Sequence, residues 1–158
     1  MGSFGSYTIE SMRLQHIDDV MRVETSCHPH PWTPQMFLQE LQREQAHIEV
    51  LRRDADKQVV GFINHWVVLD ELHLLNVAIL PEERRRGHAR RLVEHMLAFA
   101  LSSQCRLVML EVRRSNEAAL AMYRSFGFSS VGMRPGYYAD NHEDAILMNL
   151  QLPAPRIV

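Results

Sequence analysis

Five arginines surround a single glycine in the segment RRRGHARR, residues 84–91. The formal net charge of the whole chain is only −2, so this positive charge is local. Three uses compete for such a segment: a nucleic-acid patch, a solvated helix face, or a cradle for a phosphorylated ligand. The chemistry that the segment could perform depends on where the helix around it begins.

Arginines in the first turn of a helix meet the positive end of the helix dipole, which is unfavourable. A bound anion reverses this, because the first-turn amides, the dipole and the guanidinium groups all attract one negative group. Gly87 has no side chain, so the backbone can approach a phosphate closely. The segment therefore favours a phosphate cradle, but the patterns GxxxxGK and GxGxxG of common nucleotide sites are absent.

One acid interrupts the apolar run LVMLEV, residues 107–112. Burial disfavours a charged carboxylate and raises its pKa, which suits a general base. Glu111 could equally face solvent or pair with Arg113 on the same face of a strand. The residues alone leave a catalytic and a structural interpretation open.

Hydrophobic periodicity predicts the elements that position these residues. Strands are expected at residues 7–12, 48–52, 59–69, 71–80, 107–112, 129–133 and 144–152, and helices at 14–24, 35–43, 88–102 and 117–126. Thr33 and Asn116 are candidate N-caps, and Gly127 is a candidate C-terminal stop. The pattern predicts one α/β (α+β) domain over residues 1–158, with a mixed, mostly antiparallel sheet of about seven strands and about four flanking helices.

Composition excludes several classes of protein. Of the 158 residues, 46% are hydrophobic and 23% charged, as in an ordinary globular domain. No apolar run is long enough for a membrane span and the first residues do not resemble a signal peptide, so a cytoplasmic protein is expected. The 17 basic residues are offset by 19 acids, which argues against a nucleic-acid partner. The histidines at 28, 30 and 142 lack ligand spacing, and no metal is predicted.

The loop and its flanking elements resemble the GCN5-related N-acetyltransferase superfamily, whose pyrophosphate loop reads Gln/Arg-x-x-Gly-x-Gly/Ala. Arg84, Gly87 and Ala89 fill that pattern, with Ala89 as a mild departure and His88 in place of a commonly apolar residue. Within the superfamily, nearly the whole chain resembles the ribosomal-protein-alanine N-acetyltransferases. The stretches that carry this resemblance are PW at 31–32, VLDELHLLNVAILPEERRRGHARRL, LEVRRSNEAALAMYRSFGF and YYADNHEDAILMNL.

The resemblance implies acetyl-coenzyme A (acetyl-CoA) as cosubstrate. Its pyrophosphate would bind the amides of residues 85–90, and its pantetheine arm would follow strand residues 77–79, where an amide would also hold the oxyanion. The implied cofactor-binding residues are Val77, Ala78, Ile79, Arg84, Arg85, Arg86, Gly87, His88, Ala89, Arg90 and Asn116. Glu111 is implied as the general base and Tyr123 as the general acid. Trp32 and Tyr138 would flank a peptide groove.

The expected function is transfer of the acetyl group of acetyl-CoA to a protein N-terminal α-amine, namely the N-terminal alanine of small-subunit ribosomal protein eighteen. The partner is thus the N-terminal peptide of a ribosomal protein, and the oligomeric state stays open. Two alternatives remain: acetylation of another peptide N-terminus or small amine, or a module that binds acyl-coenzyme A without catalysis. A binding module would need neither Glu111 nor Tyr123.

Overall fold

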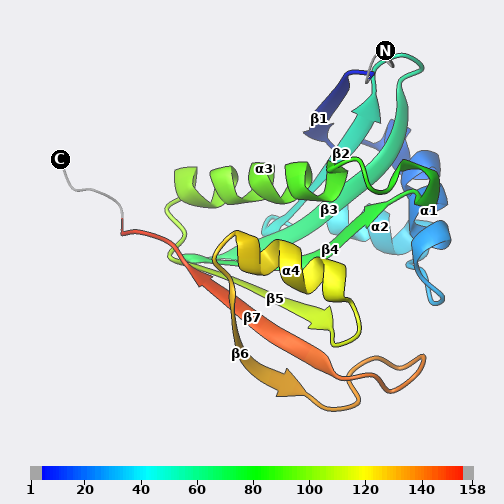
Figure 1. The fold of residues 1–158 in the computed structure, drawn as a ribbon. Helices are drawn as coiled ribbons and strands as arrows, with labels where there is room; N and C mark the ends of the chain where they lie inside the picture. The colour runs from blue at the N-terminus through cyan, green and yellow to red at the C-terminus, as the bar shows by residue number, and fades with distance from the viewer. Residues whose placement is uncertain (1–4, 155–158) are drawn as a thin grey trace. The chain divides into compact units, whose positions relative to one another are not determined.

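Seven strands and four α-helices form the framework of residues 5–154, the part of the chain that the computed structural model describes (Figure 1). The strands are β1 (Tyr7–Ser11), β2 (Ala46–Arg53), β3 (Gln58–Val68), β4 (Glu71–Ile79), β5 (Leu107–Arg113), β6 (Ser129–Arg134) and β7 (Ala145–Gln151). The α-helices are α1 (Ile17–Cys27), α2 (Pro34–Leu41), α3 (His88–Ser102) and α4 (Glu117–Ser125), with short 3-10 turns η1 (Leu14–His16) and η2 (Pro81–Glu83).

The strands lie in one mixed sheet in the order β1-β2-β3-β4-β5-β7-β6. The pairs β1/β2, β5/β7 and β6/β7 are antiparallel, whereas β4 and β5 are parallel. A parallel pair needs a long crossover connection, and the segment that contains α3 provides it. The predicted fold class, a mostly antiparallel mixed sheet of seven strands with four helices, is confirmed.

Internal contacts divide the chain into two compact units. The first comprises Met1–His65 and Asn76–His95, and the second comprises Trp66–Leu75 and Met96–Val158. The two units are considered one at a time below.

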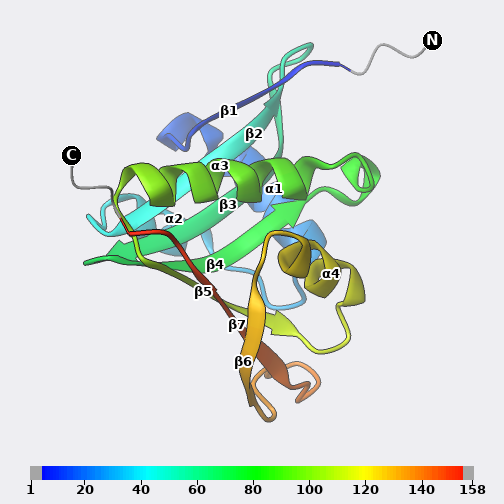
Figure 2. The same ribbon diagram turned by 60° about the vertical axis from the view of Figure 1, so that its left-hand side comes forward.

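In the first unit, β1 pairs with β2 from Tyr7 opposite Arg53 to Ser11 opposite Glu49. Both views show the two strands side by side (Figures 1 and 2). Helix α2 packs on β2 and on α1. It begins at Pro34, one residue before the predicted start. The predicted N-cap is confirmed, because the Thr33 hydroxyl accepts a hydrogen bond from the Met36 amide at 3.2 Å and proline occupies the first turn.

In the second unit, β5 lies between β4 and β7. Its side chains alternate, with Val108, Leu110 and Val112 buried and the intervening residues half-buried. Because successive side chains point to opposite faces, Glu111 lies on the half-buried face of the sheet. In both views β7 lies between β5 and β6 (Figures 1 and 2).

Most predicted boundaries hold to within two residues, and α3 begins and ends at the predicted residues. The predicted helix 14–24 differs, because a 3-10 turn precedes α1. The His16 imidazole accepts a hydrogen bond from the Arg13 amide at 2.9 Å, which closes that turn separately. Helix α1 also continues to Cys27, and Pro29 soon afterwards prevents further extension.

Candidate active site

The loop before α3 has a left-handed backbone at two positions. The φ angle is +65° at Arg85 and +79° at Gly87. The Arg91 amide donates to the Gly87 carbonyl oxygen at 3.1 Å, and the amides of the turn that precedes it have no acceptor within the helix. A Cβ atom placed on Gly87 would meet no atom within 4 Å, so the space beside this residue is open. An anion could occupy it.

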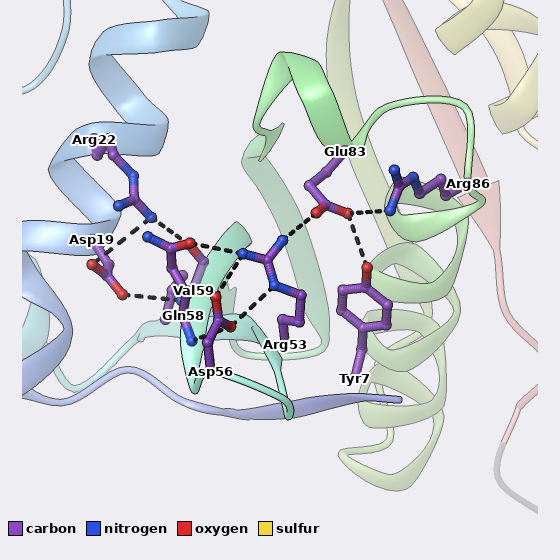
Figure 3. Close-up of polar contacts among 9 residues, drawn as sticks. All are labelled: Tyr7, Asp19, Arg22, Arg53, Asp56, Gln58, Val59, Glu83 and Arg86. Carbon is purple, nitrogen blue, oxygen red and sulfur yellow. Dashed lines mark hydrogen bonds and ion pairs between the residues drawn. The ribbon is translucent and has the colours of Figure 1, made fainter. Parts of the chain in front are cut away.

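Four donors converge on the carboxylate of Glu83, a residue that is only 3% exposed. From β1 and β2, the Tyr7 hydroxyl donates at 3.0 Å and the Arg53 guanidinium at 2.5 Å (Figure 3). From the loop and the start of α3, the Arg86 guanidinium lies at 3.2 Å and the His88 Nε2 at 3.3 Å. The carboxylate therefore ties β1 and β2 to the predicted phosphate loop.

Burial raises the pKa of Glu83, but the hydrogen bonds from Tyr7 and His88 and the charges of Arg86 and Arg53 outweigh it and leave the pKa below its usual range. The carboxylate is thus held in its charged form. Sequence analysis missed this residue, because a glutamate two positions after a proline looks like any exposed turn residue.

Replacing Glu83 with Gln should lower the free energy of unfolding by about 2 kcal/mol at pH 7, because it weakens several hydrogen bonds to a buried charge. A group whose pKa is lower in the folded than in the unfolded state stabilises the folded protein at pH values above the unfolded-state pKa, which is about 4.3 for glutamate. This stabilisation is lost as the pH falls below that value and through the folded-state pKa. Urea unfolding at a series of pH values measures both effects. The difference between wild type and variant should shrink below about pH 4. Glu82→Gln, an exposed neighbour, is the control and should change stability little.

Arg84, Arg86 and Arg91 have contacts within the protein. The Arg84 Nε donates to the Ile79 carbonyl oxygen at 3.3 Å, and an Arg91 guanidinium nitrogen donates to the Tyr7 carbonyl oxygen at 2.9 Å. Arg86 pairs with the buried carboxylate described above. The principal donors toward a phosphate are therefore the backbone amides of the loop and of the first turn of α3. The side chain of His88 is buried against the Tyr7 ring, with ring centroids 4.4 Å apart.

The predicted pantetheine strand, residues 77–79, is the end of β4. Gly61 on β3 approaches it closely, since a Cβ there would lie 2.5 Å from the Ile79 side chain and 2.9 Å from the Ala78 carbonyl oxygen. The Cys27 thiol also donates a hydrogen bond to the Ile79 carbonyl oxygen at 3.3 Å. These contacts fix the strand end that leads into the loop.

In the second unit, Glu111 forms a short hydrogen bond with a histidine that sequence analysis did not single out. Its Oε2 lies 2.7 Å from the Nε2 of His73. The parallel register places His73 opposite Met109, and Glu111 follows two residues later on the same face. Only this register, which the sequence does not specify, brings the two side chains together.

The hydrogen bond from His73 lowers the pKa of Glu111, and it outweighs the opposing effect of burial; the charges of His73 and Arg134 lower it further. The expectation that burial would raise this pKa is therefore wrong. The structural alternative for Glu111, a pair with Arg113, is also not what the structure shows.

Arg113 instead holds the loop between β6 and β7. Its guanidinium donates to both carboxylate oxygens of Asp140, at 3.1 and 3.0 Å, and lies 3.9 Å from the centroid of the Tyr138 ring. Glu143 accepts hydrogen bonds from the Ser115 amide, at 2.8 Å, and from the Ser115 hydroxyl. The loop residue Tyr138 is thus fixed next to the end of β5.

Both tyrosines of the predicted site remain protonated. Burial raises the pKa of Tyr138 to about 12, although the Arg113 charge opposes it. Burial also raises the pKa of Tyr123, and the nearby Tyr138 raises it further. Tyr123 is 5% exposed and packs edge to face against Phe128, with ring centroids 5.6 Å apart. Tyr138 acts on the pKa of Tyr123, and Glu111 acts on the pKa of Tyr138, so Tyr138 links the other two groups electrostatically.

Asn116 caps α4, as predicted, because its side-chain oxygen accepts from the Ala119 amide at 3.1 Å. The contact of Asn116 with the cofactor stays a prediction that is separate from its role as a helix cap.

A buried carboxylate also fixes the loop that contains Trp32. Glu24, 3% exposed, accepts from the Trp32 amide at 2.9 Å and from the Asn76 side chain at 3.2 Å, and the His28 imidazole lies 3.4 Å from it. The Trp32 ring packs on Phe37, with centroids 5.2 Å apart. Trp32 lies in the first unit and Tyr138 in the second.

Residues 5–154 contain neither a cluster of metal-binding side chains nor a helix that could cross a membrane. No three histidine, cysteine, aspartate or glutamate side chains in this range gather as they would around a metal ion. None of the helices in this range is both long and apolar enough to span a bilayer.

Comparison with known proteins identifies relatives of nearly full length. The model of the acetyltransferase (GNAT) family matches residues 17–128. The [ribosomal protein bS18]-alanine N-acetyltransferase of Salmonella typhimurium is 34% identical over 147 residues, which cover 92% of this chain and 97% of that protein.

Two solved structures extend the comparison. The ribosomal-protein-S18-alanine N-acetyltransferase from Escherichia coli superimposes with a TM-score of 0.87 and 33% identity, over 96% of this chain and 97% of that one. NAA60 of Arabidopsis thaliana, solved in complex with acetyl-CoA, has a TM-score of 0.83 over 93% of this chain and 99% of that one. At 16% identity, this second likeness concerns the fold alone.

Proposed function

Because this chain belongs to the acetyltransferase (GNAT) family, we propose that it transfers the acetyl group of acetyl-CoA to the N-terminal alanine of ribosomal protein bS18. The observation that carries this proposal is the match to bS18-alanine N-acetyltransferases over nearly the whole of both chains. The chain is an N-acetyltransferase, and its acyl donor is acetyl-CoA.

The cofactor loop supplies the binding part of the proposal. The left-handed backbone at Gly87 and the open space beside it fit a pyrophosphate held by the amides of residues 85–90. The pantetheine arm would follow residues 77–79, where a strand amide would stabilise the oxyanion. Asn116 is proposed as a further contact.

The low pKa of an α-amino acceptor means that the site needs only a weak general base. An α-amino group has a pKa of about 7.7 to 8.0, against about 10.4 for lysine, so a much larger fraction of it is neutral near pH 7. We propose that the remaining proton is removed at Glu111, either by its carboxylate or by the group that is hydrogen-bonded to it. A lysine side chain would need far stronger assistance, which favours an N-terminal acceptor.

Tyr123 is proposed as the group that assists departure of the thiolate. A phenol of ordinary pKa near 10 is already a weaker acid than a thiol near 8.5, and burial raises the pKa of Tyr123 further. Complete proton transfer before carbon–sulfur cleavage is therefore unfavourable. Tyr123 would instead donate a hydrogen bond to sulfur while the bond breaks.

Acetylation of a synthetic peptide with the N-terminal sequence of bS18 tests the function directly. The purified chain and acetyl-CoA should add one acetyl group, detected by intact mass, to a peptide that begins with a free alanine. A matched peptide with a blocked N-terminus and an internal lysine should stay unmodified. Equal acetylation of both peptides would indicate a lysine or general amine acetyltransferase, and binding of CoA without any transfer would indicate a non-catalytic module.

A further inference from the structure

The hydrogen bond between His73 and Glu111 determines which atoms of the pair can accept a proton. Glu111 is held in its ionised form, and a carboxylate can only accept hydrogen bonds. The Nε2 of His73, 2.7 Å away, must therefore carry the hydrogen. In a neutral imidazole with hydrogen on Nε2, the other ring nitrogen, Nδ1, has the basic lone pair.

The exposed fractions of the two side chains also favour His73 over Glu111 as the proton acceptor. The His73 side chain is 35% exposed, whereas the Glu111 side chain is 17% exposed. Both side chains lie on one face of the sheet, where the paired stretch of β4 and β5 ends at Leu74 and Leu110. The imidazole is therefore the more accessible member of the pair.

We propose that His73 accepts the proton of the substrate α-ammonium group at Nδ1, while Glu111 orients the imidazole through Nε2. This proposal rests on the function proposed above. A hydrogen-bonded carboxylate fixes the tautomer of a histidine base and stabilises the imidazolium that forms. A neutral imidazole is also a stronger base than a carboxylate, so it is the better acceptor for the proton of an α-ammonium group.

The proton and bond changes balance as follows. One N–H bond of the α-ammonium breaks, and its proton binds Nδ1 of His73, from which it later passes to water. The neutral amine attacks the thioester carbonyl carbon, the carbon–nitrogen bond forms, and the carbon–sulfur bond breaks. The second proton lost by the nitrogen ends on the sulfur of coenzyme A, assisted by Tyr123.

Other groups around the pair set its electrostatic surroundings. Arg134, on β6, stabilises the negative charge of Glu111. Tyr138, from the loop between β6 and β7, interacts with Glu111 and stays neutral. Arg113 is occupied by Asp140 and the Tyr138 ring. The hydrogen bond from His73 and the charge of Arg134 thus keep the carboxylate ionised, which is the state that orients His73.

Two substitutions of His73 separate proton transfer from positioning. His73→Ala should lower kcat by about 100-fold, with the KM for acetyl-CoA unchanged, and added imidazole should restore part of the lost kcat. His73→Gln can still donate a hydrogen bond to Glu111 but has no basic nitrogen, so it should be as slow as the alanine variant. His95→Ala, which removes an exposed histidine of α3, should keep wild-type kcat with or without imidazole.

Each outcome decides the proposal. Loss of kcat in both variants, with imidazole rescue of His73→Ala alone, supports His73 as the base. Wild-type kcat in His73→Gln would show that the histidine only positions Glu111, and absence of rescue in a folded His73→Ala protein would also overturn the proposal. If the wild-type enzyme itself acetylates no amine, the proposed function fails, whereas an active wild type with an unaffected His73→Ala overturns only the role of His73.

Discussion

Glu111→Gln is expected to lower kcat by about 100-fold or more and to leave the binding of acetyl-CoA unchanged. The substitution keeps the size of the side chain but removes the charge that holds His73 at 2.7 Å. Without a carboxylate, the tautomer of the imidazole is no longer fixed and the imidazolium is no longer stabilised. Loss of turnover follows whether Glu111 takes the proton itself or orients the histidine that does.

Steady-state kinetics with the alanine peptide and calorimetry with coenzyme A measure the two quantities separately. Glu117→Gln is a suitable control, because Glu117 is an exposed acid in the first turn of α4. A Glu111→Gln enzyme with normal kcat would exclude Glu111 from the chemistry. Weakened coenzyme A binding with a normal kcat would instead mean that Glu111 belongs to the cofactor site.

Gly87→Glu should weaken coenzyme A binding by about 100-fold, which corresponds to about 2.8 kcal/mol. Two effects act together. A side chain at a φ of +79° is strained, by roughly 1 to 2 kcal/mol for an ordinary residue. The added carboxylate would also occupy the open space beside the loop, where it would repel the pyrophosphate.

Gly87→Asn is the matched control for this substitution. Asparagine tolerates a left-handed backbone better than most residues and carries no charge, so it should weaken binding much less than glutamate does. Calorimetric titration with coenzyme A gives both affinities, and circular dichroism reports whether each variant is folded. Equal, unchanged affinities for the two variants would contradict a pyrophosphate site at this loop.

Local sequence signals predicted the framework well. The N-caps at Thr33 and Asn116, and the helix that begins at His88, follow from side chains that act within a few residues along the chain. Such signals do not depend on tertiary context. For the same reason Gly87 could be identified as a backbone position with a special role before its φ angle was known.

The partners of the site residues could not be predicted in the same way. His73 is one of nine histidines, and only the register between two strands, distant in sequence, makes it the neighbour of Glu111. Glu83 and Glu24 are buried by contacts with distant segments, so their importance depends on tertiary structure. The direction of the pKa shift of Glu111 was mispredicted for this reason, because burial was considered without its hydrogen-bond partner.

The network around Glu83 also bears on the dynamics of the first strand. The Tyr7 hydroxyl donates to a carboxylate 76 residues later in the chain, and the Tyr7 carbonyl accepts from Arg91 on α3. The same carboxylate holds Arg86 and His88 on either side of Gly87. Local opening of β1 therefore breaks the hydrogen bonds of Tyr7 with Glu83 and Arg91, which support the loop. A ligand that binds only the ordered loop stabilises the closed state of β1, so it should slow amide hydrogen exchange in that strand.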